Sequence, residues 1–252
     1  MKTFLPTKDP LKNYITSSGS LERLNDIAQQ LPKLLLTGSL RDNINSLKNN
    51  DLSIKTLIKR GNSRELKLAM MQLSFISHAY IWGAEMPSKV LPEVISKPWV
   101  QLSNILGRPP ILSYASYCLD NWYRLNVKKD ISLENIGLLT NFLGGVDEDW
   151  FVTIHVCIED AARDAIKAAD LISRFNDKNT TKDFLDNLKL IISSLRKVNT
   201  IFSRMPEKCD PYIYYHRVRP FIFGTKDNPD IKKGLIYENQ YNNEPQFFRG
   251  ET

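Results

Sequence analysis

The chain has 252 residues, of which 42% are hydrophobic and 25% are charged, and its formal net charge at pH 7 is +6. This composition is ordinary for a globular protein with a sizeable core and excludes wholesale disorder. The 34 basic residues are dispersed among 28 acidic ones, without the clustered basic stripe of a nucleic-acid surface, so we expect no nucleic-acid partner.

Neither a targeting segment nor a membrane segment is evident. The opening MKTFLPTKDP lacks the apolar core of a signal peptide, and no run approaches the roughly 18 apolar residues that a spanning helix needs. The cysteines Cys118, Cys157 and Cys209 are odd in number and too far apart for a CxxC metal pair. These features predict a soluble, reduced, cytoplasmic protein without a membrane partner.

Helical periodicity dominates the first half of the chain. Residues 20–35 place apolar side chains on one stripe, and Pro32 is expected to end or kink that helix. Residues 63–83 predict a second helix that stops at Gly83. A short helix is expected over 98–107.

The second half continues in the same way. A longer helix begun by Pro110 is predicted over 109–125. The strongest helical pattern covers 147–175, and 181–205 follows as its amphipathic partner. No alternating strand pattern or hairpin turn lies between these segments, and the connections are expected to be loops, notably at 86–98, 127–149 and 225–245. The predicted fold is all-α, with residues 1–100 as a small N-terminal helical lobe.

One histidine lies in an apolar run, FVTIHVCIEDAARDA, at residues 151–165. On a helix, His155 and Glu159 share a face with Phe151. This spacing suits a buried histidine oriented by Glu159, but it also suits a pocket histidine that binds or exchanges a proton near neutral pH. No second His or Cys lies at ligand spacing, so we expect no metal site from these residues alone.

Two further clusters suggest a pocket. RPPILSYASYCLDNW brings Tyr114, Tyr117 and Cys118 within one turn, as either core residues or the lining of a cavity. MPEKCDPYIYYHRVRP gathers aromatic and basic residues between two prolines. Its Arg219 could hold a ligand carboxylate in two parallel hydrogen bonds or form an interhelical salt bridge covered by tyrosines.

Four motifs together resemble the indoleamine 2,3-dioxygenase family, in the same order and with matching spacing. They are LPxxIxxPWxxLSxxLGRPPILSYASYxLDNW, DExWFxxIHVxIE, MPExCDPYxYYxRVRP and the closing FFRGET. The similarity extends from about Leu21 to the last residue.

The resemblance implies an all-α protein with a small N-terminal domain and a large helical domain that encloses haem b. Residues 101–252 would be the N-terminal portion of that large domain. The implied reaction inserts O2 across the indole C2–C3 bond of L-tryptophan and gives N-formylkynurenine, in the kynurenine pathway. Haem, with its iron, would supply the oxygen chemistry.

The resemblance also assigns roles to individual residues. Phe151 and Tyr214 would form aromatic walls around the indole, and Arg219 would pair with the substrate carboxylate. Tyr114 and Tyr117 would pack over the haem and the distal pocket. Thr252 would lie near a haem propionate and the substrate ammonium.

His155 falls where some family members have Ser and others His, just above the distal face of the haem. The Ser-bearing members imply that this side chain is not an essential base, so orientation of the substrate or of O2 is its expected role.

The family's proximal iron ligand is a histidine well beyond the FRGET motif. His78, His155 and His216 are the histidines of this chain, and none matches that proximal position, so no metal ligand is expected in it. We therefore expect a truncated form that is catalytically poor alone, with apolar surface exposed around 150–174 and 210–224, and a possible complementary C-terminal chain.

Two other functions remain open at this point. A haem oxygenase of the same superfamily could act on another indole through a similar pocket. Alternatively, the chain could be an inactive helical binding module that lacks iron.

Overall fold

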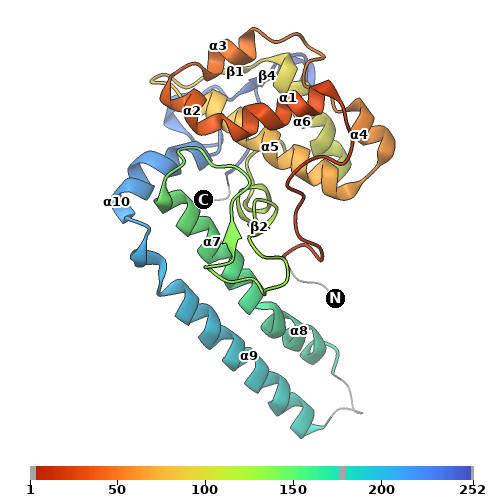
Figure 1. The fold of residues 1–252 in the computed structure, drawn as a ribbon, viewed down its shortest axis with the longest axis vertical. Coiled ribbons are helices and arrows are strands. Elements are labelled where there is room, and N and C mark those ends of the chain that lie inside the picture. The colour runs from red at the N-terminus through yellow and green to blue at the C-terminus, as the bar shows by residue number, and fades with distance from the viewer. Residues whose placement is uncertain (1–3, 176–179, 251–252) are drawn as a thin grey trace.

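The computed structural model describes residues 4–175 and 180–250, and helices make up most of it, which confirms the all-α prediction (Figure 1). The α-helices are α1 (Gly19–Gln29), α2 (Leu31–Leu36), α3 (Leu40–Asn45), α4 (Lys55–Arg60), α5 (Ser63–Trp82), α6 (Glu93–Leu106), α7 (Val146–Ala161), α8 (Arg163–Ile172), α9 (Thr181–Phe202) and α10 (Pro211–Ile213). The described part of the chain has no helix long and apolar enough to cross a membrane.

The predicted break at Pro32 is confirmed. Helix α1 buries Leu21, Leu24 and Ile27 on its inner face and ends at Gln29. Pro32 then occupies the first turn of α2, where its missing N–H is not needed by the helix.

Helix α5 is the centre of the fold and confirms the prediction for 63–83. The Asn62 side chain caps its first turn by accepting a hydrogen bond from the Arg64 N–H, and Gly83 follows its last residue. Most of its residues are buried because α1, α6 and the short turns at Ala115–Leu119 and Arg219–Ile222 pack around it.

Helix α6 begins at Glu93 rather than at Pro98, so the predicted 98–107 helix was too short and the predicted loop 86–98 too long. Pro98 lies inside this helix, where it removes one backbone hydrogen bond. Contacts with a distant segment hold the first turn in place: the Glu93 N–H donates to the Glu238 carboxylate, and the Ser96 hydroxyl donates to the Glu238 carbonyl.

The predicted helix over 109–125 was wrong. Only a π-helical turn forms there, η1 (Ala115–Leu119). The buried Asn121 amide explains the interruption: it donates to the Tyr117 and Thr140 carbonyls and accepts from the Thr140 N–H. A side chain that pairs with backbone in this way replaces continued helical bonding.

Within residues 4–175 and 180–250, four two-residue strands form where the sequence showed no strand pattern. They are β1 (Val90–Leu91), β2 (Tyr123–Arg124), β3 (Ile136–Gly137) and β4 (Ile236–Tyr237). Strand β1 pairs parallel with β4, and β2 pairs antiparallel with β3. The first pair joins segments on both sides of residue 100, and one core cluster also crosses that position; a domain boundary near residue 100 stays a prediction.

The predicted 147–175 helix forms but is divided between α7 and α8 at Ala162. The Ser194 hydroxyl of α9 donates to the Ala161 carbonyl at this break. Helix α9, predicted at 181–205, begins with a capping box between Thr180 and Asp183. Helices α8 and α9 lie side by side and project from the body of the molecule (Figure 1).

The expected exposure of apolar side chains around 150–174 and 210–224 is confirmed only in part, because Trp150, Ile154 and Phe221 are buried. Leu171 is 53% exposed, Tyr212 72% and Tyr215 57%. Further apolar side chains of α9 also face solvent, including Phe184, Leu185, Leu190, Ile192, Leu195 and Phe202.

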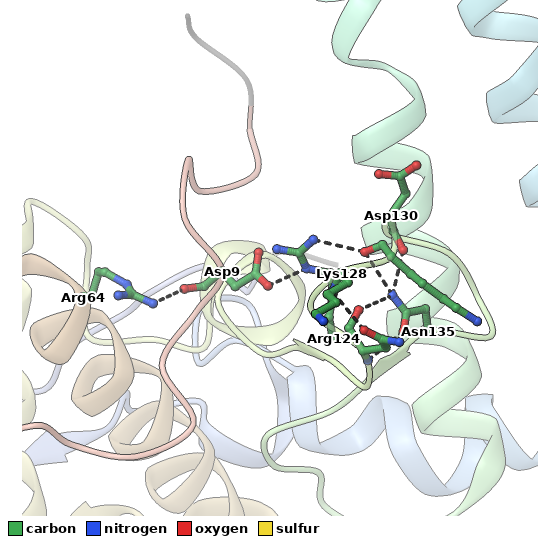
Figure 2. A network of polar contacts seen from close by, with 8 residues as sticks. Asp9, Arg64, Arg124, Lys128, Asp130 and Asn135 are labelled. Carbon is green, nitrogen blue, oxygen red and sulfur yellow. Dashed lines mark hydrogen bonds and ion pairs between the residues drawn. The ribbon is translucent and has the colours of Figure 1, made fainter.

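The N-terminal segment is fastened to two distant elements (Figure 2). Arg64 donates to the Asp9 carbonyl over 2.6 Å, and Arg124 forms a 2.7 Å ion pair with the Asp9 carboxylate. Arg124 also donates to the Lys129 carbonyl, and the Asn135 side chain donates to carbonyls of the same loop. The network thereby links α5 to the loop between β2 and β3.

Candidate active site

A cavity of about 580 Å³ opens between η1, α7 and the segment 205–222. This volume is in the usual range for small-molecule sites. Six of the seven residues that the sequence singled out line it: Tyr114, Tyr117, Phe151, His155, Tyr214 and Arg219. The seventh, Thr252, lies outside the described residues.

His155 is oriented by its own helix. Its Nδ1 lies 2.7 Å from the Phe151 carbonyl oxygen, and because a carbonyl only accepts, Nδ1 carries the proton. In the neutral ring Nε2 therefore keeps its lone pair, and no hydrogen-bond partner for it occurs within the described ranges. Burial lowers the pKa of His155 below its usual value. The ring thus brings a neutral hydrogen-bond acceptor to the cavity.

Glu159 does not orient His155, as one interpretation of the sequence held. Its carboxylate accepts a 2.9 Å hydrogen bond from the Tyr114 hydroxyl. The Tyr114 ring meets the His155 ring edge-on, with centroids 6.0 Å apart. Glu159 therefore acts on the cavity by holding Tyr114.

Aromatic rings form one wall of the cavity. Phe151 stacks on Tyr214 with centroids 4.1 Å apart and an interplanar angle of 22°. On its other side Phe151 contacts the His155 ring at 4.2 Å. Tyr117 lies deeper, 5% exposed, and packs on Phe142. Such a wall suits a planar, apolar ligand.

Arg219 is the cation of the cavity lining. Its guanidinium lies 5.4 Å from the centre of the Tyr215 ring, and it pairs with no carboxylate in the described part of the chain. The interhelical salt bridge considered from the sequence is therefore not formed. A partly buried guanidinium without a counter-charge is suited to binding a ligand carboxylate.

His78 braces the cavity from behind, a role that the sequence analysis missed. It is fully buried on α5. Its Nδ1 donates to the Phe221 carbonyl over 2.6 Å, and its Nε2 accepts from the Leu112 N–H over 2.8 Å. Leu112 itself lines the cavity and Phe221 precedes the lining residue Ile222, and both ring nitrogens are occupied. Burial lowers the pKa of His78 to about 4.

Glu148 is a second support that the sequence did not reveal. Its side chain is fully buried, and its carboxylate accepts hydrogen bonds from the N–H groups of Phe142 and Leu143. Burial raises its pKa to about 7, although these hydrogen bonds oppose the rise. Phe142, which Glu148 holds, stacks on Phe221 with centroids 4.7 Å apart.

Where the structure describes the chain, its cysteines and acidic residues offer no metal centre of their own. The described residues contain no group of three or more His, Cys, Asp or Glu side chains placed to hold an ion. All three cysteines are free and buried, and burial raises the pKa of Cys157 to about 12 and that of Cys209 to about 11. At neutral pH these thiols stay protonated.

Comparison with known proteins agrees with the motifs. A family model for indoleamine 2,3-dioxygenase matches residues 1–252. The chain is 35% identical over 228 residues to indoleamine 2,3-dioxygenase 1 of Rattus norvegicus, covering 90% of this chain and 55% of that protein.

Two more relatives match more than nine tenths of this chain. The indoleamine 2,3-dioxygenase of Saccharomyces cerevisiae is 32% identical over 251 residues, covering 94% of this chain and 54% of the relative. A protein named myoglobin from Haliotis madaka is 31% identical over 240 residues, covering 92% of this chain and 58% of the relative. The chain thus spans about half the length of the curated relatives it matches. With all of its residues matched by the family model, the chain belongs to the indoleamine 2,3-dioxygenase family.

Proposed function

We propose that the protein acts in the haem-dependent dioxygenation of L-tryptophan, in which O2 is inserted across the indole C2–C3 bond to give N-formylkynurenine. The observation that carries this proposal is the cavity itself. It gathers an aromatic wall, a neutral histidine acceptor and an unpaired arginine from segments that are far apart in the sequence.

The described residues fit one face of a haem. The wall formed by Tyr114, Tyr117 and Phe151 is aromatic and largely apolar, as a porphyrin face requires. His78 is not free to ligate iron because both of its ring nitrogens are hydrogen-bonded within the protein. When bound, haem would supply the activation of O2, which no protein side chain performs unaided.

The chain's own residues would bind and orient the substrate. The stacked pair of Phe151 and Tyr214 would contact the indole ring as one aromatic wall, and Arg219 would pair with the carboxylate. The unprotonated Nε2 of His155 would accept the indole N–H. Fixing the ring in this way favours the reactive geometry without requiring His155 to remove a proton. Thr252 would lie near the substrate ammonium, as the family resemblance implies.

Haem binding and turnover must be tested separately, since the relatives carry two names, dioxygenase and myoglobin. The purified 252-residue chain is titrated with haem, reduced and exposed to carbon monoxide while the Soret band is recorded. We expect saturable binding that weakens in Tyr117→Ala, with His216→Ala as the control because His216 does not line the cavity.

Tryptophan is then added, first under carbon monoxide and then under O2. We expect it to shift the Soret band, while turnover to N-formylkynurenine, followed by mass spectrometry, should be slow, since His78, His155 and His216 do not match the family's proximal iron ligand. A spectrum of unbound haem at every ratio, with or without tryptophan, would overturn the assignment. Saturable haem binding without any effect of tryptophan would keep the cofactor and reject the substrate.

A further inference from the structure

Two hydroxyl groups meet inside the cavity without satisfying each other. The Tyr117 Oη from η1 and the Tyr214 Oη from the π-helical turn η3 (Tyr214–Val218) lie 3.4 Å apart. Hydrogen bonds between hydroxyls are usually about 2.7–2.8 Å long, so this contact is weak. Neither hydroxyl has another hydrogen-bond partner among residues 4–175 and 180–250.

Their surroundings make this under-satisfaction costly. Tyr117 is buried, with its ring stacked on Phe75 and Phe142, and Tyr214 is stacked on Phe151. A polar group in such an apolar setting is destabilised when its hydrogen-bonding capacity is unused. Burial also raises the pKa of both phenols above their usual value, so each hydroxyl keeps its proton and can both donate and accept.

The same packing fixes the two hydroxyls in place. Contacts with the rings of Phe75, Phe142 and Phe151 limit rotation of Tyr117, and the 22° stack on Phe151 limits Tyr214. A ligand group that bonds to both would therefore meet a site whose geometry already exists, which reduces the entropy lost on binding.

We propose that Tyr117 and Tyr214 form a polar subsite that binds a hydroxyl group on the aromatic ring of the substrate, so that the cavity prefers a ring-hydroxylated indole amino acid to unsubstituted tryptophan. A ring hydroxyl can donate to one tyrosine and accept from the other. An unsubstituted ring leaves both tyrosines with only their weak mutual contact. This inference rests on the proposed function, in which the cavity takes an indole, and deepens it by naming the substrate class.

The other polar groups of such a ligand would bind other residues of the cavity. A carboxylate is matched by the Arg219 guanidinium, and the indole N–H by Nε2 of His155. The tyrosine pair is neutral and suits a neutral partner that is both donor and acceptor, as a phenolic hydroxyl is.

The test is a calorimetric titration of the 252-residue protein, loaded with haem where it binds. The ligands are L-tryptophan and the four tryptophans that carry one hydroxyl on a benzo-ring carbon. Wild type is compared with Tyr117→Phe, Tyr214→Phe and the double variant. Tyr212→Phe is the matched control, because Tyr212 is 72% exposed and does not line the cavity.

We expect at least one hydroxylated ligand to bind wild type about five- to tenfold more tightly than tryptophan, the effect of one or two net hydrogen bonds. Each cavity variant should lose most of this preference, measured as the ratio of the two affinities within the same variant, and Tyr212→Phe should keep the wild-type ratio. Tyr214→Phe removes the less buried hydroxyl, so it gives the result even where Tyr117→Phe unfolds.

The outcomes separate the two proposals. Binding of tryptophan with equal or weaker binding of all four hydroxylated ligands would overturn the subsite and leave the proposed function standing. A preference that survives in the double variant would also overturn it. If no indole binds at all, the proposed function fails, and the subsite fails with it.

Discussion

The Tyr114 hydroxyl donates a 2.9 Å hydrogen bond to the carboxylate of Glu159, which lies 45 residues further along the chain. This bond connects the segment before η1 to α7 across the edge of the cavity, and it leaves His155 to be oriented by the Phe151 carbonyl instead. Glu159 is therefore a positioning residue for the aromatic wall.

Truncating this pair should weaken the fold by a measurable but moderate amount. We expect Glu159→Ala and Tyr114→Phe each to cost about 1 kcal/mol of unfolding free energy, since hydrogen bonds to charged groups contribute about 1.5–3 kcal/mol when fully buried and both residues are partly exposed. The double variant should cost less than the sum of the two. Urea unfolding of all four proteins measures this coupling, and strictly additive effects would contradict a direct bond.

Removing the His78 ring should be far more damaging. It fills a fully buried position and satisfies the Leu112 N–H and the Phe221 carbonyl. His78→Ala leaves a cavity and two unsatisfied backbone groups, so we expect a loss of about 3–5 kcal/mol, measured by urea unfolding. The exposed His216→Ala is the control and should change stability by less than about 0.5 kcal/mol.

The same residue predicts a pH dependence. The pKa of His78 is about 4 in the folded protein against an ordinary 6.5, so below pH 6.5 the unfolded chain binds a proton that the folded protein does not. Stability is therefore fully present above pH 6.5 and falls as the pH drops towards 4. The shift of about 2.5 units corresponds to about 3 kcal/mol over this window.

Glu148 works in the opposite sense, because its raised pKa of about 7 makes stability fall as the pH rises from 4.5 towards 7. The His78 contribution is thus isolated by subtracting the pH profile of His78→Gln from that of wild type, since Glu148 is present in both. A flat difference between pH 4 and 6.5 would contradict the buried neutral ring.

The two supports, His78 and Glu148, also show what the sequence could not reveal. Local motifs identified the cavity residues because the aromatic and basic side chains cluster within short segments. The partners of His78 are 34 and 143 residues away, and no local pattern encodes such distances. His78 is a single histidine in an apolar helix, and Glu148 lies between Asp147 and Asp149 in an acidic first turn, so neither gave a local sign of its supporting role.

The long helices could be predicted because their periodicity extends over several turns. The helix predicted over 109–125 does not form, although the apolar spacing there is helical. The Asn121 side chain forms hydrogen bonds with the Thr140 backbone, and these replace continued helical bonding. Tertiary hydrogen bonding outweighed local propensity there. Ser194, which bonds to the Ala161 carbonyl where α7 and α8 divide, was equally invisible to local pattern.

His155 should be neutral at pH 7 with its proton on Nδ1. Nitrogen-15 NMR of the imidazole distinguishes the two tautomers, and a pH titration should give a pKa below 6.5 because burial lowers it. We expect His155→Ser to retain the fold and to bind tryptophan only a few-fold more weakly, since a hydroxyl can still accept the indole N–H. A proton found on Nε2 would rule out that acceptor role.

Arg219 should decide whether a ligand needs a carboxylate. Arg219→Ala is expected to weaken tryptophan binding about 10- to 100-fold, the effect of a charge-assisted bidentate pair, and to leave tryptamine binding unchanged. Arg219→Lys should recover only part of the affinity because an ammonium cannot form the paired hydrogen bonds. Arg217→Ala, an exposed neighbour outside the cavity, is the control in the same titration. Equal losses for tryptophan and tryptamine would reject the carboxylate contact.

The backbone at Gly224 lies so close to that of Gly250 that a side chain at residue 224 should not be tolerated. The closing segment runs against the end of the 3-10 turn η4 (Arg219–Ile222), where the Thr225 N–H donates to the Phe248 carbonyl over 2.9 Å. A Cβ on Gly224 would lie 2.1 Å from the Gly250 backbone nitrogen and 2.6 Å from the Phe248 oxygen. Gly224→Ala must therefore push the two backbone segments apart. We expect faster hydrogen exchange at the Thr225 amide and a loss of about 1–3 kcal/mol of unfolding free energy.

Gly19→Ala is the control, since a Cβ at Gly19 would meet nothing within 4 Å and alanine favours the helix that this residue begins. Unchanged exchange at Thr225 in Gly224→Ala would mean that this segment is not held against η4.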